Sequence, residues 1–181
     1  MDSTALVALM QEALAGVHLE RVASRDLQTT VYIARDDVPA VMLAMRDRPE
    51  LRFSVLAEVT AVDFWPREPR FELIYLLISL EHRFRVRLKV PLSSDSARVA
   101  TVSHVWPSAN WLEREVWDLF GIVFDGHPDP RRLLLPEDWE GFPLRKDYPV
   151  QIRMTPRVTE PIQVTAEEFR TNVEKDRLAR K

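Results

Sequence analysis

Residues 71–90, FELIYLLISLEHRFRVRLKV, determine the fold class that the sequence predicts. In the first half, Phe71–Leu80, both alternating sets of positions are mostly apolar, which is typical of a central strand covered on both faces. In the second half, His82–Val90, apolar residues alternate strictly with basic ones, as in a strand with one buried face. A turn near Glu81 makes the two segments antiparallel neighbours in one predicted sheet.

Basic residues occupy the polar face of the second strand, at Arg83, Arg85, Arg87 and Lys89. Two interpretations stay open for this basic stripe. It can dock an acidic partner. Alternatively, it is a solvated sheet face whose charge is offset elsewhere, because the chain as a whole has a net charge of −3.

The segments before this hairpin predict further strands and helices. Leu51–Val62 predicts a third strand, joined to Phe71–Leu80 through the loop Trp65–Pro69, and Gln28–Ala34 predicts a fourth. Apolar residues at helical spacing predict a helix over Thr4–Ala15. A second predicted helix begins after Asp36 or Asp37 and runs to about Arg46. Its inward side chains would be Val38, Val41, Met42 and Met45.

The composition bounds the function. A chain of 181 residues with 46% hydrophobic and 29% charged residues is typical of one globular domain, with room for an appended arm. The slightly acidic balance does not indicate a nucleic-acid binder. The sequence has no cysteine, which excludes disulfides, thiolate zinc sites and cysteine-ligated clusters. Without a signal peptide or an apolar run of about 20 residues, a cytoplasmic protein that does not span a membrane is expected.

Residues 110–149, NWLEREVWDLFGIVFDGHPDPRRLLLPEDWEGFPLRKDYP, concentrate aromatic, ionic and turn-forming residues. They predict a helix over Ser108–Phe120 that ends at Gly121. After Gly126 the chain is rich in proline and has little periodicity, which indicates an extended arm. A capping box at Thr165–Glu168 predicts a short final helix.

The predicted fold class is therefore α+β. Residues 1–125 would form a two-layer domain with a mixed, largely antiparallel sheet packed against helices. Residues 126–181 would form an extended, proline-rich C-terminal arm with a short helix.

The predicted helix carries an unusual set of charges. Arg114 and Asp118 are spaced i, i+4 and could pair. Glu113 and Glu115 fall among large apolar side chains, where an ionised group is costly unless it finds a cation or donors. We expect the arm to fold back so that its cations satisfy this helix. Those cations are Arg131, Arg132, Arg145 and Lys146.

Two catalytic alternatives remain weaker. Glu113 and Glu115 could act as an acid/base pair in a small hydrolase, but residues two apart on a helix point in different directions. His104 and His127 could bind a metal with Asp125 or Asp129, although their spacing matches no common zinc or iron site.

The residues of this region carry a family resemblance. The run Glu113-Arg114-Glu115, then Asp118-Leu119-Phe120, then His127, Arg131 and Leu133-Leu134, resembles the hallmark of the C subunit of respiratory NADH:quinone oxidoreductase, or complex I. The continuation EDWEGFPLRKDYP resembles the next block of the same family. The match is dense over residues 110–149 and looser over the strands from Leu51 to Pro91.

The resemblance implies a non-catalytic structural and assembly subunit of the hydrophilic arm of the complex. It would lie peripherally on the cytoplasmic side of the bacterial inner membrane, against the D and B subunits. No cofactor is expected on this chain, and FMN and iron–sulfur clusters would belong to partner subunits. A homologous subunit of an energy-converting hydrogenase-type complex stays the alternative.

The resemblance also implies roles for individual residues. A structural or partner-interface role, rather than a catalytic one, is expected for ten residues: Glu113, Arg114, Glu115, Asp118, His127, Arg131, Arg132, Arg145, Lys146 and Asp147.

Overall fold

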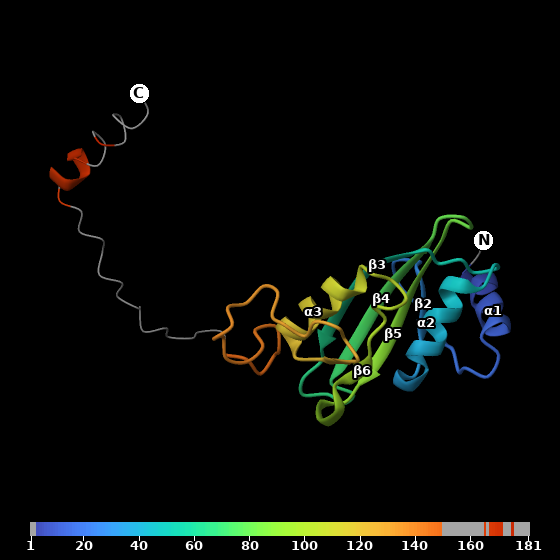
Figure 1. Ribbon diagram of the computed structural model, residues 1–181. Coiled ribbons are helices and arrows are strands. Elements are labelled where there is room, and N and C mark those ends of the chain that lie inside the picture. The colour runs from blue at the N-terminus through green and yellow to red at the C-terminus, as the bar shows by residue number, and fades with distance from the viewer. Residues whose placement is uncertain (1–2, 150–164, 166, 172–174, 176–181) are drawn as a thin grey trace. The chain divides into compact units, whose positions relative to one another are not determined.

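The computed structural model describes residues 3–149, 165, 167–171 and 175 (Figure 1). The chain divides into two compact units, Met1–Tyr148 and Pro149–Lys181. The first unit therefore extends beyond the predicted boundary at residue 125. The physical reason is that residues 126–148 make many hydrogen bonds to the body of that unit, which are described below.

A five-stranded mixed sheet forms the centre of the first unit, in the order β1-β2-β5-β4-β3. In this sheet β2 and β5 pair in parallel, and the other neighbours are antiparallel. The predicted α+β class with a mixed, largely antiparallel sheet is therefore confirmed. The strands are β1 (Glu20–Val22), β2 (Thr29–Tyr32), β3 (Val55–Asp63), β4 (Phe71–Ser79) and β5 (Phe84–Leu92).

The predicted hairpin of residues 71–90 is the pair β4–β5, with Phe71 opposite Leu92 and Ser79 opposite Phe84. The strand predicted from Leu51 begins only at Val55. The reason is a turn before it, in which the Leu51 amide donates to the Arg48 carbonyl (3.0 Å). Leu51 is fully buried in that turn, so its apolar character reflects the core and not a strand.

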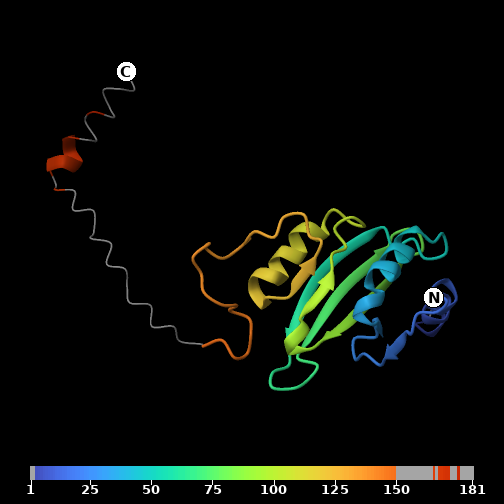
Figure 2. The same ribbon diagram turned by 60° about the horizontal axis from the view of Figure 1, so that its bottom comes forward.

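Three helices pack against the sheet: α1 (Ser3–Ala13), α2 (Val38–Asp47) and α3 (Ala109–Phe120). All four side chains predicted to point inward from the second helix, Val38, Val41, Met42 and Met45, are fully buried. In Figures 1 and 2, α3 lies beside β3 and β4, whereas α1 and α2 lie toward the β2 side of the sheet.

Short elements connect these layers. Two 3₁₀ turns, η1 (Arg35–Asp37) and η2 (Ser94–Ser96), precede α2 and β6. A small parallel sheet pairs β6 (Arg98–Ala100) with β7 (Val123–Asp125). This second sheet holds the chain on both sides of α3 and so fixes where the helix begins and ends.

The two faces of β4 differ in burial. Leu73, Tyr75 and Leu77 are fully buried under the helices. Ile74, Leu76 and Ile78, on the opposite face, are only half-buried, although β4 lies inside the sheet. The expectation that this strand is covered on both faces is therefore wrong for residues 3–149, because their helices supply one layer only.

The predicted capping box is present at residues 165–168. The Thr165 amide donates to the Glu168 carboxylate (3.0 Å), and the Glu168 amide donates to the Thr165 hydroxyl (3.3 Å). Residues 167–171 are helical. The basic end expected for this helix, at Arg177, Arg180 and Lys181, lies outside the described residues. Among the described helices, none is long and apolar enough to cross a membrane.

Candidate functional site

Helix α3 and residues 126–148 form the candidate site. The helix ends at Gly121, which adopts a left-handed conformation (φ 72°) and donates its amide to the Trp117 carbonyl (2.8 Å). A Cβ at Gly121 would lie 2.5 Å from Phe142 and 2.6 Å from Arg145. Glycine is therefore required both for the turn and for the close approach of residues 142–145.

Asp118 collects four donors from residues 132–135. The amides of Leu133, Leu134 and Leu135 donate to one carboxylate oxygen at 3.1, 2.8 and 2.9 Å, and the Arg132 guanidinium donates to the other at 2.7 Å. The Asp118 side chain is fully buried. Burial raises its pKa, but these donors outweigh that effect and keep the pKa below its usual range. The carboxylate is thus ionised and holds this turn to α3.

Arg114 contacts the preceding part of the same segment. Its guanidinium donates to the carbonyls of Arg131 and Arg132, both at 3.0 Å, and lies 3.3 Å from Asp129. It also lies over the Trp111 ring, 5.1 Å from the centroid. The i, i+4 pair expected between Arg114 and Asp118 does not form, because each side chain is engaged by residues 129–135 instead.

Arg145 contacts the C-terminal end of α3. Its guanidinium donates to the carbonyls of Phe120 (2.6 Å) and Gly121 (3.4 Å), which have no partner within the helix. It also lies over the rings of Phe71 and Phe142, at 5.3 and 4.6 Å. A cation at this end is favoured by the helix dipole.

A further ion cluster connects Asp147 to the sheet. Arg70 donates two hydrogen bonds to Asp63, at 3.0 and 2.9 Å, and a third to Asp147 at 2.7 Å. The Lys146 amide also donates to Asp63 (2.8 Å), whereas the Lys146 side chain is exposed. Burial raises the pKa of Asp63, but these donors and the Trp65 amide outweigh it and hold the pKa at about 2.

Sequence reasoning missed Asp63 and Arg70 as members of this site. The available signal was a pair of opposite charges at facing ends of two predicted strands, flanking the Trp65–Pro69 loop. Their connection to Asp147 spans 77 positions and has no local pattern that could reveal it.

Glu113 is the other fully buried acid of α3. It accepts hydrogen bonds from the Thr101 hydroxyl (2.5 Å) and the Val102 amide (2.7 Å). Burial raises its pKa to about 7, because these two donors only partly offset the desolvation of the charge. The Tyr75 hydroxyl is buried nearby without a hydrogen-bond partner, and burial, with a smaller effect of the Glu113 charge, raises its pKa well above the usual value.

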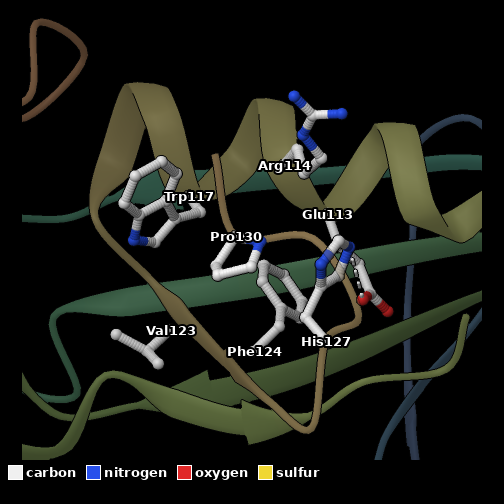
Figure 3. Close-up of a pocket in the computed structure, with 7 residues that line it drawn as sticks. All are labelled: Glu113, Arg114, Trp117, Val123, Phe124, His127 and Pro130. Carbon is white, nitrogen blue, oxygen red and sulfur yellow. Dashed lines mark ion pairs between the residues drawn. The ribbon is translucent and has the colours of Figure 1, made fainter. Parts of the chain in front are cut away.

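His127 lies between Glu113 and the start of the arm (Figure 3). Its Nδ1 accepts a hydrogen bond from the Asp129 amide (3.0 Å), so Nε2 carries the proton of the neutral ring. Nε2 lies 3.0 Å from the Asn110 carbonyl and 3.8 Å from Glu113. The ring thus joins the arm to the N-terminal half of α3.

A cavity of about 50 Å³ adjoins this pair, lined also by Arg114, Trp117, Val123, Phe124 and Pro130. Small-molecule sites have volumes of roughly 300–1,000 Å³. The cavity can hold water but not a substrate of ordinary size.

The expected partners of the two glutamates are not those observed. No arm cation bonds to Glu113 among the described residues, and its partners are Thr101, Val102 and His127. Glu115 is half-buried and makes no hydrogen bond or ion pair with any described residue. The two glutamates therefore do not share an environment, and their arrangement does not favour an acid/base pair.

The remaining predicted residues are more exposed. Arg131 pairs with its neighbour Asp129 at 2.7 Å, and it contacts α3 only through its carbonyl. Arg132 also donates to the Trp139 carbonyl (2.8 Å). His104 is exposed, and the described part of the chain has no group of three or more metal-ligating side chains.

Comparisons with known proteins give the family. A model of the family described as "Respiratory-chain NADH dehydrogenase, 30 Kd subunit" matches residues 31–153. The C subunit of NADH-quinone oxidoreductase from Geotalea uraniireducens is 40% identical over 150 residues, which is 83% of this chain and 90% of the relative. The fused C/D subunit from Acidiphilium cryptum is 41% identical over 150 residues, covering 79% of this chain and 25% of that longer protein.

Two solved structures are similar as well. A trypsin-resistant fragment of Nqo5 has a TM-score of 0.57 and 34% identity, covering 68% of this chain and 98% of that chain. A chain of a membrane-bound sulfane sulfur reductase, described as an archaeal respiratory membrane complex, has a TM-score of 0.67 and 28% identity, covering 81% and 85%.

Proposed function

The chain belongs to the family of the 30 kDa subunit of respiratory-chain NADH dehydrogenase, and from this membership we propose that it is a non-catalytic structural and assembly subunit. Its place would be the hydrophilic arm of a proton-translocating NADH:quinone oxidoreductase. There it would brace the subunits that form the quinone site and carry the clusters.

The use of the charged residues carries this proposal. Asp118, Arg114 and Arg145 are occupied by backbone groups of residues 120–135, and Arg70 is occupied by two carboxylates. Removing one partner of such buried pairs is costly, so these contacts hold residues 126–148 in a defined shape. Ionic groups of an active site would instead face a cavity large enough for a substrate.

Exposed apolar side chains around this segment support a docking role. Four large ones are 45–60% exposed: Trp65, Trp111, Leu134 and Leu144. Trp111 stacks on Arg114, and Leu134 follows the turn held by Asp118. Apolar groups presented on a rigid support lose little conformational entropy on association, which is the arrangement expected of an assembly surface.

The D subunit of the complex, with the cluster-bearing B subunit, is the proposed neighbour. The C/D name of the Acidiphilium cryptum relative supports contact with the D subunit, because that longer protein contains a region similar to this chain. FMN and iron–sulfur clusters would then lie on partner chains, in keeping with the absence of cysteine from these 181 residues. Attachment would be peripheral, on the cytoplasmic side of the membrane.

A related complex is the second candidate. The similarity to a chain of the sulfane sulfur reductase supports a homologous subunit of an energy-converting hydrogenase-type complex. The structural role of this chain would be the same in either assembly, and the partners would differ.

Purification of the tagged full-length chain from its source tests the proposal. We expect the D and B subunits to accompany it, NADH:quinone reductase activity in the complex, and no flavin or iron bound to the chain when it is isolated. Stoichiometric flavin or metal on the isolated chain would overturn the non-catalytic role. Recovery of hydrogenase-type subunits in place of the D and B subunits would select the second candidate.

A further inference from the structure

The sheet face opposite the helices is not accounted for by the site above. It consists of three adjacent rows, one on each of β3, β4 and β5. The register places Lys89, Arg87 and Arg85 opposite Ile74, Leu76 and Ile78. On the other side, Thr60 and Glu58 face Ile74 and Leu76. We call this set the open sheet face.

Its middle row is apolar and half-buried. An apolar row inside a sheet normally lies under a second layer about 10 Å away, because water contact with branched side chains is unfavourable. Phe71–Ser79 is apolar on both alternations, as in a strand that is covered on both faces, yet the helices cover only the row of Leu73, Tyr75 and Leu77. A second layer is therefore expected from outside residues 3–149.

The basic row divides into two halves. Lys89 pairs with Glu72 (2.6 Å), and Arg87 pairs with Asp26 (2.6 Å). Arg85 and the neighbouring Arg83 are exposed and have no ion pair with any described residue. The two interpretations of the basic stripe thus each hold for one half. Charge is offset within the chain at Arg87 and Lys89, and it is free for a partner at Arg83 and Arg85.

We propose that the open sheet face binds an amphipathic helix of a partner subunit, with the helix's apolar stripe on Ile74, Leu76 and Ile78 and acidic residues beside Arg83 and Arg85. The inference rests on the proposed function, because it assigns a further contact surface to the same assembly subunit. A helix about 10 Å across spans the two to three strands of the face, which lie about 4.8 Å apart. A second copy of this chain fits less well, because it would bring the same unpaired guanidinium groups.

Thiol reactivity measures whether the face is covered. The chain has no cysteine, so Leu76→Cys introduces one thiol in the open sheet face. The full-length variant is treated with a maleimide, alone and in the purified complex, and modification is scored on this chain by mass. We expect the rate to fall at least tenfold in the complex. An equal rate in the two states overturns the proposal, and so does a thiol that is already protected in the isolated chain.

Charge reversal tests the acidic side of the partner. We expect Arg85→Glu to lower the recovery of the complex at least fivefold without changing the unfolding midpoint of the isolated chain. Arg48→Glu is the matched control, because Arg48 is exposed and its side chain has no ion pair with any described residue. Equal recovery of the two variants would remove the charge argument. If the wild-type chain has no subunit partners, the proposed function itself fails, which is a different result from an unprotected thiol at position 76 in an intact complex.

Discussion

Replacement of Asp118 by asparagine should release residues 126–148 from α3. The carboxylate is fully buried and accepts three amides and one guanidinium. An asparagine offers one oxygen, and its amide group would meet donors where an acceptor is needed. Removing one member of a buried ionic pair costs about 3–5 kcal/mol. We take about 3 kcal/mol as the expected loss, because the turn can partly relax toward solvent.

This loss should appear first as local opening of the segment. About 3 kcal/mol raises the open population on the order of 100-fold, since each 1.4 kcal/mol is a factor of ten. Trypsin cleavage after Arg131 and Arg132 should accelerate by a similar factor when opening is fast relative to cleavage. The urea midpoint of the isolated chain should fall by roughly 1–2 M, at about 2 kcal/mol per M.

Glu115→Gln is the matched control for this experiment. It removes one carboxylate from the same helix, at a position with no hydrogen bond or ion pair among the described residues. Its effect on unfolding should stay within about 0.5 kcal/mol. The reasoning is refuted if Asp118→Asn changes cleavage and stability no more than Glu115→Gln does.

Three further predictions concern other contacts. Because the pKa of Glu113 is raised from 4.5 to about 7, its folded state binds more protons, and stability should fall by roughly 3 kcal/mol between those pH values; Glu113→Gln should remove this slope from the pH profile of urea unfolding, and an unchanged slope would contradict the assignment. Gly121→Ala should destabilise by about 2–3 kcal/mol in thermal unfolding, because left-handed strain adds to the clash with neighbouring side chains; Gly16→Ala, with a positive φ but nothing within 4 Å, should cost only about 1 kcal/mol, and equal costs would exclude the clash. Arg70→Gln should raise the pKa of Asp63 from about 2, as followed by carboxyl NMR, so that the stability Asp63 gives above its unfolded pKa and loses as pH falls toward 2 is reduced; an unmoved titration would remove Arg70 as the cause.

The sequence predicted the sheet and helices where the periodicity was local. The alternation in Phe84–Leu92 and the helical spacing in Val38–Asp47 each identified the buried side chains, because one face of the element meets the core. Leu51 was misassigned for the same reason in reverse. Its burial comes from a turn, and an apolar residue alone does not distinguish a turn from a strand.

The site was less predictable than the fold. Crowded charges indicated that residues 126–148 return to α3, but not which groups meet. Arg132 pairs with Asp118, as an arm cation was expected to do for this helix, whereas Glu113 is satisfied by Thr101 and Val102. Backbone amides carry no signal of residue type, so a carboxylate bound by amides cannot be recognised from the sequence.

The most direct test of the central claim separates docking from folding. Trp111→Ser combined with Leu134→Ser removes two exposed apolar side chains, 60% and 59% exposed, and leaves the hydrogen bonds of Arg114 and Asp118 in place. Leu43→Ser, at a side chain 44% exposed on α2, is the control. The measurement is the amount of the D and B subunits recovered with the tagged chain. The account predicts a loss of at least tenfold for the double variant, with an unchanged unfolding midpoint and normal recovery for the control. Full recovery of both partners with the double variant would contradict it.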